Sequence, residues 1–292
     1  MTSKADAALS RRAFLRQMGA GAAALIAAQL LAAQQAHAEE PPPETEQPQW
    51  GILIDLTRCV GCETCALACK AANNLPNPTQ PPDGLSSRAF TFVDTHIVPG
   101  DSGEIEARSA KRQCMHCLNP ACVSACPAAA MYRREDGLVL YRAERCLGCR
   151  YCQMACPFGV PAFEWDDGVT PTISKCWLCV SRLDNGQQPA CAEACPTGAI
   201  RFGRREALLA QARAQIESNP GRYIDHIFGE HEVGGTSVLY LSDIPFEQLG
   251  FPANLPDTAP PEETEKIMRK LPAVITGTAA LMVGAALYTH RQ

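Results

Sequence analysis

Sixteen cysteines in this 292-residue chain fall into four groups of four, and thiolates are the side chains that bind soft metals and iron–sulfur clusters. The first and third quartets have the spacing C-x2-C-x2-C-x3-C, which is typical of bacterial ferredoxins. A [4Fe–4S] cluster takes four thiolates, so we expect four [4Fe–4S] clusters and a role in carrying electrons. In chain order, the quartets are Cys59, Cys62, Cys65 and Cys69; Cys114, Cys117, Cys122 and Cys126; Cys146, Cys149, Cys152 and Cys156; and Cys176, Cys179, Cys191 and Cys195.

Two other kinds of cysteine site compete with this interpretation. A high density of cysteines in an exported chain also fits a disulfide scaffold, and CxxC pairs also hold zinc. Zinc ribbons use two pairs that are far apart, whereas Cys59, Cys62 and Cys65 fall within seven positions. Covalent haem requires C-x-x-C-H, and no CxxC pair in this chain is followed by histidine. The spacing therefore favours iron–sulfur clusters.

The N-terminus predicts export by the twin-arginine pathway. Residues 10–16 read Ser-Arg-Arg-Ala-Phe-Leu-Arg, a mildly apolar stretch follows, and residues 36–38 form an A-x-A cleavage site. We predict a signal peptide over residues 1–38 and a location on the periplasmic side of the inner membrane. This pathway carries folded proteins, so clusters are inserted while the thiols are still reduced in the cytoplasm. The leader therefore argues against disulfides.

Internal repeats predict the fold class. The run Cys-hydrophobic-Gly-Cys occurs at residues 59–62 and 146–149, and Ala-Cys-x-x-Ala-Cys-Pro occurs at residues 121–127 and 190–196. In two-cluster ferredoxins, three close cysteines hold one cluster and a fourth, often followed by proline, reaches the other. Lys70 stands at this proline position in the first quartet. We expect an α+β fold built from duplicated two-cluster ferredoxin-like modules, with a C-terminal transmembrane helix.

The rest of the chain predicts how these modules are arranged. Short strands are expected at residues 51–56, 137–141 and 238–241, a hairpin at 90–98 and 104–111, and a helix at 204–218. The predicted organisation is a linker over 39–50, a four-cluster domain over 51–251 and a second linker over 252–268. Ferredoxin-type segments within the domain cover about residues 50–80, 105–136 and 137–166, with the fourth quartet at 176–196.

The C-terminus predicts a membrane anchor over residues 269–290. Residues 271–288 carry no charge, and at about 1.5 Å per residue they span roughly 27 Å, close to the hydrocarbon thickness of a bilayer. The alternative is a buried core helix. The segment follows a linker and is rich in glycine and alanine, which suits helix packing in lipid.

The sequence lacks the features that are typical of several other classes of function. The chain has a net charge of −5 and no basic stripe for nucleic acid. It contains no P-loop, dinucleotide fingerprint or G-x-S-x-G motif. His116 is expected to be a packed histidine, and Trp177 to shield a cluster from water. We therefore expect an electron-transfer subunit without catalytic residues.

The cysteine pattern over residues 51–203 resembles the iron–sulfur subunits of the dimethyl sulfoxide reductase family. Residues 222–252, together with the leader and the anchor, resemble those of quinone-linked periplasmic [NiFe] hydrogenases, and formate dehydrogenase β subunits are near relatives. The resemblance implies four ligand sets, in which quartets one and four share two clusters and quartets two and three share the others. The implied sets are Cys59, Cys62, Cys65 and Cys195; Cys69, Cys176, Cys179 and Cys191; Cys114, Cys117, Cys122 and Cys156; and Cys126, Cys146, Cys149 and Cys152.

The resemblance implies a function and two partners. Electrons would pass between a catalytic subunit, a [NiFe] hydrogenase, and a multispanning membrane subunit that reduces quinone. The alternative is the β subunit of a formate dehydrogenase or another molybdopterin oxidoreductase. A redox sensor or assembly scaffold is a different class of function, which the absence of an effector or DNA-binding module in the sequence disfavours.

Overall fold

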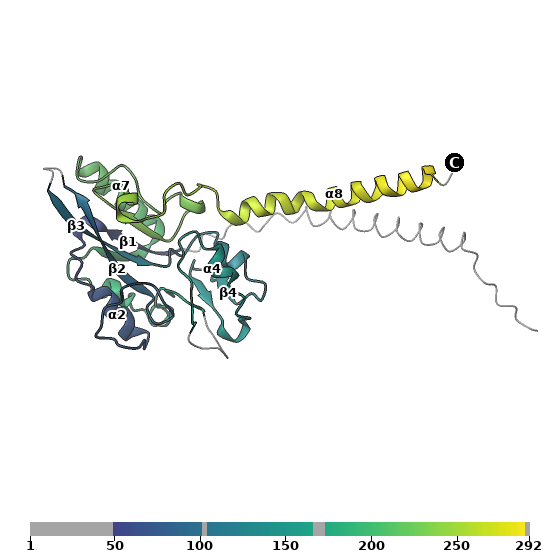
Figure 1. The fold of residues 1–292 in the computed structure, drawn as a ribbon. Coiled ribbons are helices and arrows are strands. Elements are labelled where there is room, and N and C mark those ends of the chain that lie inside the picture. The colour runs from purple at the N-terminus through teal and green to yellow at the C-terminus, as the bar shows by residue number, and fades with distance from the viewer. Residues whose placement is uncertain (1–48, 101–103, 166–172, 290–292) are drawn as a thin grey trace, which may run out of the picture. The chain divides into compact units, whose positions relative to one another are not determined.

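The structure is a computed structural model, and it describes residues 49–100, 104–165 and 173–289. The chain divides into two units, one of residues 47–266 and one of residues 1–46 with 267–292. The first unit carries all sixteen cysteines. Figure 1 shows its short helices and strands and the connections between them. The predicted leader lies outside the described residues.

A three-stranded sheet lies at the centre of the first unit. Its order is β8 (Ile200–Arg204), β1 (Trp50–Asp55) and β9 (Val238–Leu241), with β1 antiparallel to β8 and parallel to β9. The predicted strands at 51–56 and 238–241 are confirmed. Both faces of β1 and β9 are buried, which explains why their sequences are apolar runs without alternation.

The two faces of this sheet contact different parts of the chain. Leu53 and Leu239 face helix α7 (Arg205–Ser218), which packs Leu208, Leu209 and Ala212 against them. The predicted helix at 204–218 is thereby confirmed. Ile52 and Ile54 face the opposite way, toward the hairpin and the cysteine-bearing loops. One face of the sheet therefore packs against the cysteine-bearing loops, and the other face packs against α7.

The predicted hairpin is confirmed by strands β2 (Thr91–Pro99) and β3 (Ile105–Gln113). Its register pairs Val93 with Lys111 and Thr91 with Gln113. The outer end of the hairpin is exposed, whereas Ala110 and Lys111 are buried. The turn at 101–103 lies outside the described residues. The hairpin therefore brings its inner end to the cysteines and continues into Cys114.

The backbone is built from two copies of one arrangement. In the first, β1 leads through a 3-10 turn (Leu56–Arg58) to Cys59, and it pairs with β8, which follows Cys195. In the second, β5 (Val139–Tyr141) leads through a 3-10 turn (Ala143–Arg145) to Cys146, and it pairs with β4 (Met131–Arg133), which follows Cys126. The expected duplication is therefore confirmed, and the second copy is inserted within the first.

Short helices carry or flank the remaining cysteines of both copies. They are α2 (Thr64–Ala72), α3 (Ala121–Ser124), α4 (Tyr151–Ala155), α5 (Val180–Asp184) and α6 (Ala190–Glu193). Strands β6 (Ala162–Phe163) and β7 (Ile173–Ser174) form a small ribbon. Two 3-10 turns, Glu232–Gly234 and Phe246–Leu249, lie near the end of the unit.

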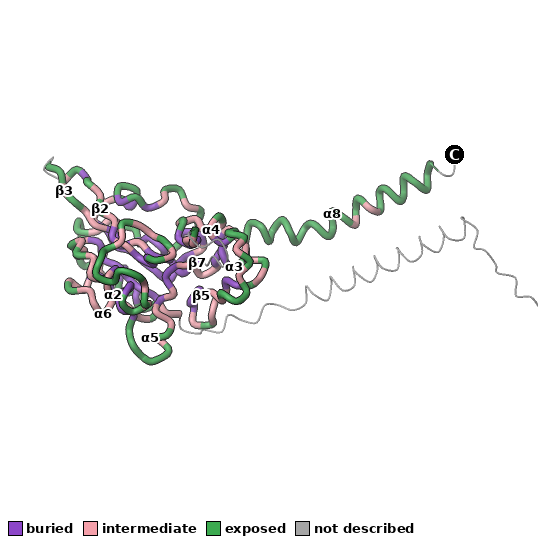
Figure 2. Tube along the Cα trace, turned by 60° about the horizontal axis from the view of Figure 1, so that its bottom comes forward, coloured by how far each residue is buried: buried purple, intermediate pink, exposed green. Residues whose placement is uncertain are grey.

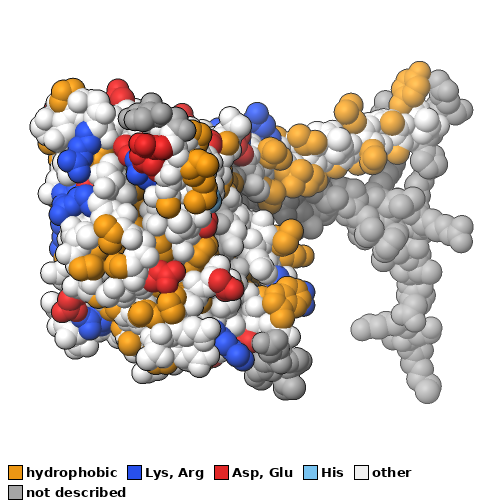
Figure 3. All heavy atoms as spheres, turned by 60° about the vertical axis from the view of Figure 1, so that its left-hand side comes forward, with side chains coloured by type: hydrophobic (Ala, Val, Ile, Leu, Met, Phe, Trp, Pro, Cys, Tyr) orange, Lys and Arg blue, Asp and Glu red, His pale blue; other side chains and the backbone are white. Residues whose placement is uncertain are grey.

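Helix α8 (Pro260–Thr289) is the one helix among the described residues that is long and apolar enough to cross a membrane. Its most apolar 18-residue stretch has a mean hydropathy of 1.7. None of this stretch is buried within the protein, whereas the core helix of a soluble protein would be mostly buried (Figures 2 and 3). The helix begins within the range predicted as a linker. Pro260 and Pro261 are tolerated because the first helical turn needs no N–H donors, and Glu262 and Glu263 favour the helix N-terminus.

Candidate iron–sulfur sites

The first and third quartets form loops with the same backbone. Gly61 and Gly148 have φ values of 68° and 67°, and Glu63 and Arg150 adopt left-handed conformations immediately before α2 and α4. A side chain at Gly61 would place its Cβ 2.5 Å from the Ser109 hydroxyl. Glycine therefore allows the loop to turn tightly enough to direct three thiols to one side.

The first set, Cys59, Cys62, Cys65 and Cys195, lines one cavity of the first unit. Val93, Lys111 and Ile200 complete the walls of this first cavity. Three of the thiols come from residues 59–65, a loop and the first turn of α2, and Cys195 comes from the loop before β8, which pairs with β1. The sheet pairing therefore brings together cysteines that are far apart in the sequence. Cys62 is exposed, so this set reaches the protein surface.

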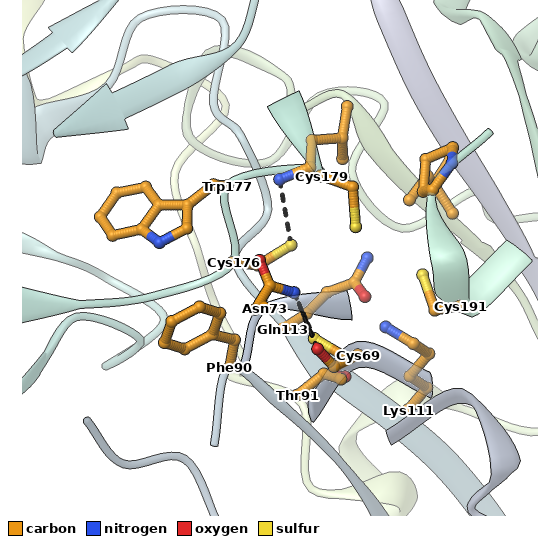
Figure 4. A pocket seen from close by; sticks show the side chains of 13 residues that line it. Cys69, Asn73, Phe90, Thr91, Lys111, Gln113, Cys176, Trp177, Cys179 and Cys191 are labelled. Atoms are coloured by element: carbon orange, nitrogen blue, oxygen red, sulfur yellow. Dashed lines mark hydrogen bonds between the residues drawn. The ribbon is translucent and has the colours of Figure 1, made fainter. Parts of the chain in front are cut away.

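The second set, Cys69, Cys176, Cys179 and Cys191, lines a neighbouring cavity (Figure 4). Phe90, Trp177 and Ile52 also line this second cavity, together with Lys111 and Gln113 of the hairpin. Cys69, Cys176 and Cys191 are buried. This set is therefore more enclosed than the first.

The other two sets lie in the inserted copy. The thiols of Cys114, Cys156 and Cys122 all raise the pKa of Cys117, although burial raises it most. Similarly, burial and then the thiols of Cys126, Cys146 and Cys149 raise the pKa of Cys152 to about 11. The structure thus brings together the third set (Cys114, Cys117, Cys122 and Cys156) and the fourth set (Cys126, Cys146, Cys149 and Cys152). Cys149 is exposed, as Cys62 is in the first set.

Burial disfavours the charged form of several of these thiols. Burial raises the pKa of Cys65 to about 11 and the pKa values of Cys122 and Cys176 to about 12. None of the sixteen cysteines forms a disulfide. Because a thiol must lose its proton to bind iron, these raised values mean that metal binding must displace protons at each site.

Backbone amides are directed at several sulfurs. The N–H groups of Ala130, Gly148 and Leu178 lie 3.2, 3.4 and 3.4 Å from the sulfurs of Cys126, Cys146 and Cys176. The Asn73 amide donates to Cys69 Sγ at 3.6 Å, as Figure 4 shows. Such donors stabilise negative charge on sulfur and raise the reduction potential of a bound cluster.

Two buried lysines near the cysteines were not predicted from the sequence. Lys111 and Lys175 are each 1% exposed. Burial acts to lower the pKa of Lys111, but the negative charges of the Cys191, Cys65 and Cys176 thiolates raise it above its ordinary value. No local signal separates Lys111 from the charged residues around it on β3. Only the register of the hairpin turns its side chain toward the cavities.

The predicted roles of His116 and Trp177 agree with their surroundings. His116 is buried, and its Nδ1 accepts a hydrogen bond from the Val139 N–H at 3.1 Å. Burial and the nearby Lys175 hold the pKa of His116 well below its usual value, so it is a neutral packed side chain. Trp177 stacks on Tyr141 at 5.7 Å and meets the edge of Phe90, which places an aromatic wall beside the second set.

The chemistry of these cavities fits an iron–sulfur cluster. Among residues 49–100, 104–165 and 173–289, no three His, Cys, Asp or Glu side chains converge as ligands of a single metal ion. The thiols of the first two sets instead surround a space. In the second cavity, Lys111 Nζ and Gln113 Nε2 are buried donors without a hydrogen-bond partner in the described chain. The sulfides of a cluster are acceptors of the kind that these donors lack.

Thiols that are grouped around cavities in duplicated ferredoxin-like modules define an iron–sulfur protein. The comparison with protein families agrees, because residues 106–205 match the 4Fe–4S dicluster domain. This match covers the second, third and fourth quartets and leaves the first outside.

Individual relatives extend the similarity beyond these residues. A protein of Nitratidesulfovibrio vulgaris is 38% identical over 97% of this chain and 78% of the relative. Hydrogenase-2 operon protein HybA of Escherichia coli O157:H7 is 33% identical over 97% of this chain and 95% of the relative. The iron–sulfur subunit of the nitrate-inducible formate dehydrogenase of Escherichia coli K12 is 36% identical over 65% of this chain and 66% of that subunit. The chain belongs to this family of iron–sulfur electron-transfer subunits of oxidoreductase complexes.

Proposed function

We propose that the four sets of cysteines hold four [4Fe–4S] clusters, one in each set. The proposal is supported by the grouping of the thiols, since each set combines three cysteines of one quartet with one from its partner quartet. When bound, a [4Fe–4S] cluster takes up and releases one electron at a time. The protein binds and spaces the four sites, shields them from water and directs N–H groups at their sulfurs.

We further propose that electrons enter and leave at the first and fourth sets. These sets contain the exposed cysteines Cys62 and Cys149, whereas the cysteines of the other two are buried or partly buried. Electron tunnelling requires close approach, so a partner must reach a site near the surface. The second and third sets would then connect the two ends.

The catalytic partner that we propose is a [NiFe] hydrogenase, and the acceptor is a multispanning membrane subunit that reduces quinone. The observation that carries this choice is the extent of similarity. The match to HybA covers nearly the whole of both chains, whereas the matches to formate dehydrogenase subunits cover 65% and 69% of this chain. The alternative remains a subunit of a formate dehydrogenase or another molybdopterin oxidoreductase.

We also propose that the protein is exported by the twin-arginine pathway and lies on the periplasmic side of the inner membrane, with α8 as its anchor. The charge-free stretch of α8 and its exposed apolar side chains support the anchor. The motif at residues 10–16 supports the export route.

A single substitution tests the relay. Wild-type protein purified from detergent-solubilised membranes is expected to contain about sixteen iron atoms, and Cys149→Ser about four fewer. In membranes, Cys149→Ser is expected to abolish hydrogen-driven quinone reduction, because one site of the relay is lost. Glu144→Ser, an exposed change just before the same loop, is the matched control.

The same membranes distinguish the two partner classes. Hydrogen-driven activity and co-purification of a [NiFe] subunit support the hydrogenase, whereas formate-driven activity with a molybdopterin subunit supports the alternative. Unchanged quinone reduction and iron content in Cys149→Ser would contradict the relay itself.

A further inference from the structure

Lys111 is a single buried cation that two cysteine sets share. It lies on β3 and lines both the first and the second cavity. Figure 4 shows its side chain pointing toward Cys69 and Cys191. Its charge acts on Cys59 and Cys65 of the first set and on Cys69, Cys176 and Cys179 of the second. Lys111 therefore stands at the junction of the two sites.

The ammonium group of Lys111 lacks the partners that a buried charge usually has. Its Nζ makes no hydrogen bond among the described residues, although the side chain is 1% exposed. Lys175 provides the contrast, because its Nζ donates to the carbonyls of Val139 and Cys176 at 2.6 and 3.0 Å. An unpaired buried cation is strongly destabilising unless negative charge lies nearby. The negative charge available to Lys111 is that of the thiolates and of the clusters that they would hold.

The position of Lys111 is fixed by the sheet and the hairpin. The Tyr240 hydroxyl of β9 donates to the Lys111 carbonyl at 2.9 Å, and Lys111 pairs with Val93 across the hairpin. Both neighbours are buried. The cation is therefore carried by a strand rather than by a mobile loop, and it keeps the same relation to both cavities.

We propose that Lys111 raises the reduction potentials of the clusters in the first and second sets together. Each cluster gains one negative charge when it takes up an electron, and a positive charge beside it stabilises the reduced form. The effect is strong where water is excluded, because screening is weak there. This inference rests on the proposed function, and Lys111 would make the first pair of sites easier to reduce than their burial alone allows.

The test is an EPR-monitored redox titration of the purified full-length protein, with iron content measured on the same samples. In Lys111→Met, we expect two of the four midpoint potentials to move to more negative values and the other two to move much less. Lys111→Arg keeps the positive charge, so we expect the same two midpoint potentials to lie close to their wild-type values in this variant. Arg108→Met removes the same charge from the same strand, outside both cavities, and is expected to leave all four potentials in place.

The outcomes separate this inference from the proposed function. Wild-type protein with fewer than four clusters would contradict the ligand assignment, whatever Lys111 does. Fully loaded Lys111→Met with four unchanged potentials, or with four equal shifts, would overturn the inference alone. If Lys111→Met loses iron, Lys111→Gln is titrated in its place. Loss of iron from both variants but not from Lys111→Arg would mean that the charge holds the clusters rather than setting their potentials, and would also overturn it.

Discussion

Lys70 occupies the position at which proline follows the last cysteine of the other three quartets. Helix α2 continues to Ala72, and a proline within it would remove a hydrogen bond and clash with the preceding turn. The Lys70 side chain is buried, and its Nζ donates to the carbonyls of Asn77 and Gln80 at 3.3 and 2.8 Å. Lys70 therefore fastens the proline-containing insertion after the first quartet.

Lys70→Met is expected to release this insertion without removing a cysteine. Hydrogen bonds from a charged donor contribute about 1.5–3 kcal/mol, so we expect a comparable loss of local stability. Hydrogen–deuterium exchange should become faster over residues 73–82, with the iron content unchanged. Lys266→Met is the control, because its pair with Glu263 is exposed. Unaltered exchange over residues 73–82 would contradict this role of Lys70.

Individual residues differ in how well the sequence predicts them. The cysteines could be found because they fall into four quartets along the chain, two of which have the characteristic ferredoxin spacing. Lys111 and Lys70 could not be found in this way. Their roles depend on backbone or sulfur atoms that are distant in the sequence. The residues next to each lysine in the sequence do not indicate that its side chain is buried.

Strands β1, β8 and β9 are the elements that bring the first and second sets together, and they approach one another closely. A Cβ added at Gly51 would lie 2.7 Å from the Ser237 carbonyl oxygen. The same oxygen accepts a hydrogen bond from the Ile52 N–H at 2.9 Å. Glycine at position 51 therefore allows β1 to lie in register against β9.

Gly51→Ala is expected to lower the melting temperature of the protein, because the backbones of β1 and β9 must move apart. Overpacking of this kind costs about 1–3 kcal/mol. Gly84→Ala is the matched control, since a Cβ there meets nothing within 4 Å. The measurement is thermal unfolding followed by circular dichroism. Equal melting temperatures for the two variants would show that the sheet tolerates the added methyl group.

The sequence predicts the individual helices and strands better than it predicts which strands pair. The strand at 238–241, the helix after β8 and the hairpin all follow from local periodicity and turn residues. The pairing of β1 with β8 and β9 does not, because local patterns carry no information about distant partners. The start of α8 was also missed, since the prolines at 260 and 261 suit a linker as well as a first helical turn.

The whole molecule joins a cysteine-rich unit to an apolar helix. The charge-free part of α8 lies in the second unit, beyond Lys266. A chain that ends at Lys266 is expected to keep its clusters and to move from the membrane fraction to the soluble fraction, because it loses the apolar stretch. Fractionation followed by iron analysis measures both properties. A truncated chain that stays with the membrane would show that a partner, rather than α8, holds it there.

The insertion of one copy within the other has a consequence for the order of folding. Strand β1 is among the first parts of the domain to be synthesised. The carboxylate of Asp55 at its end nevertheless accepts a hydrogen bond from the hydroxyl of Tyr223, 168 residues later. β9, its parallel neighbour, comes later still. Contacts so distant in sequence slow folding, because a long loop must close before they form. The ribosome must therefore complete nearly the whole domain before the N-terminal strand has its neighbours. The first and second cavities can close only late in synthesis, whereas the inserted copy has its own strands much earlier.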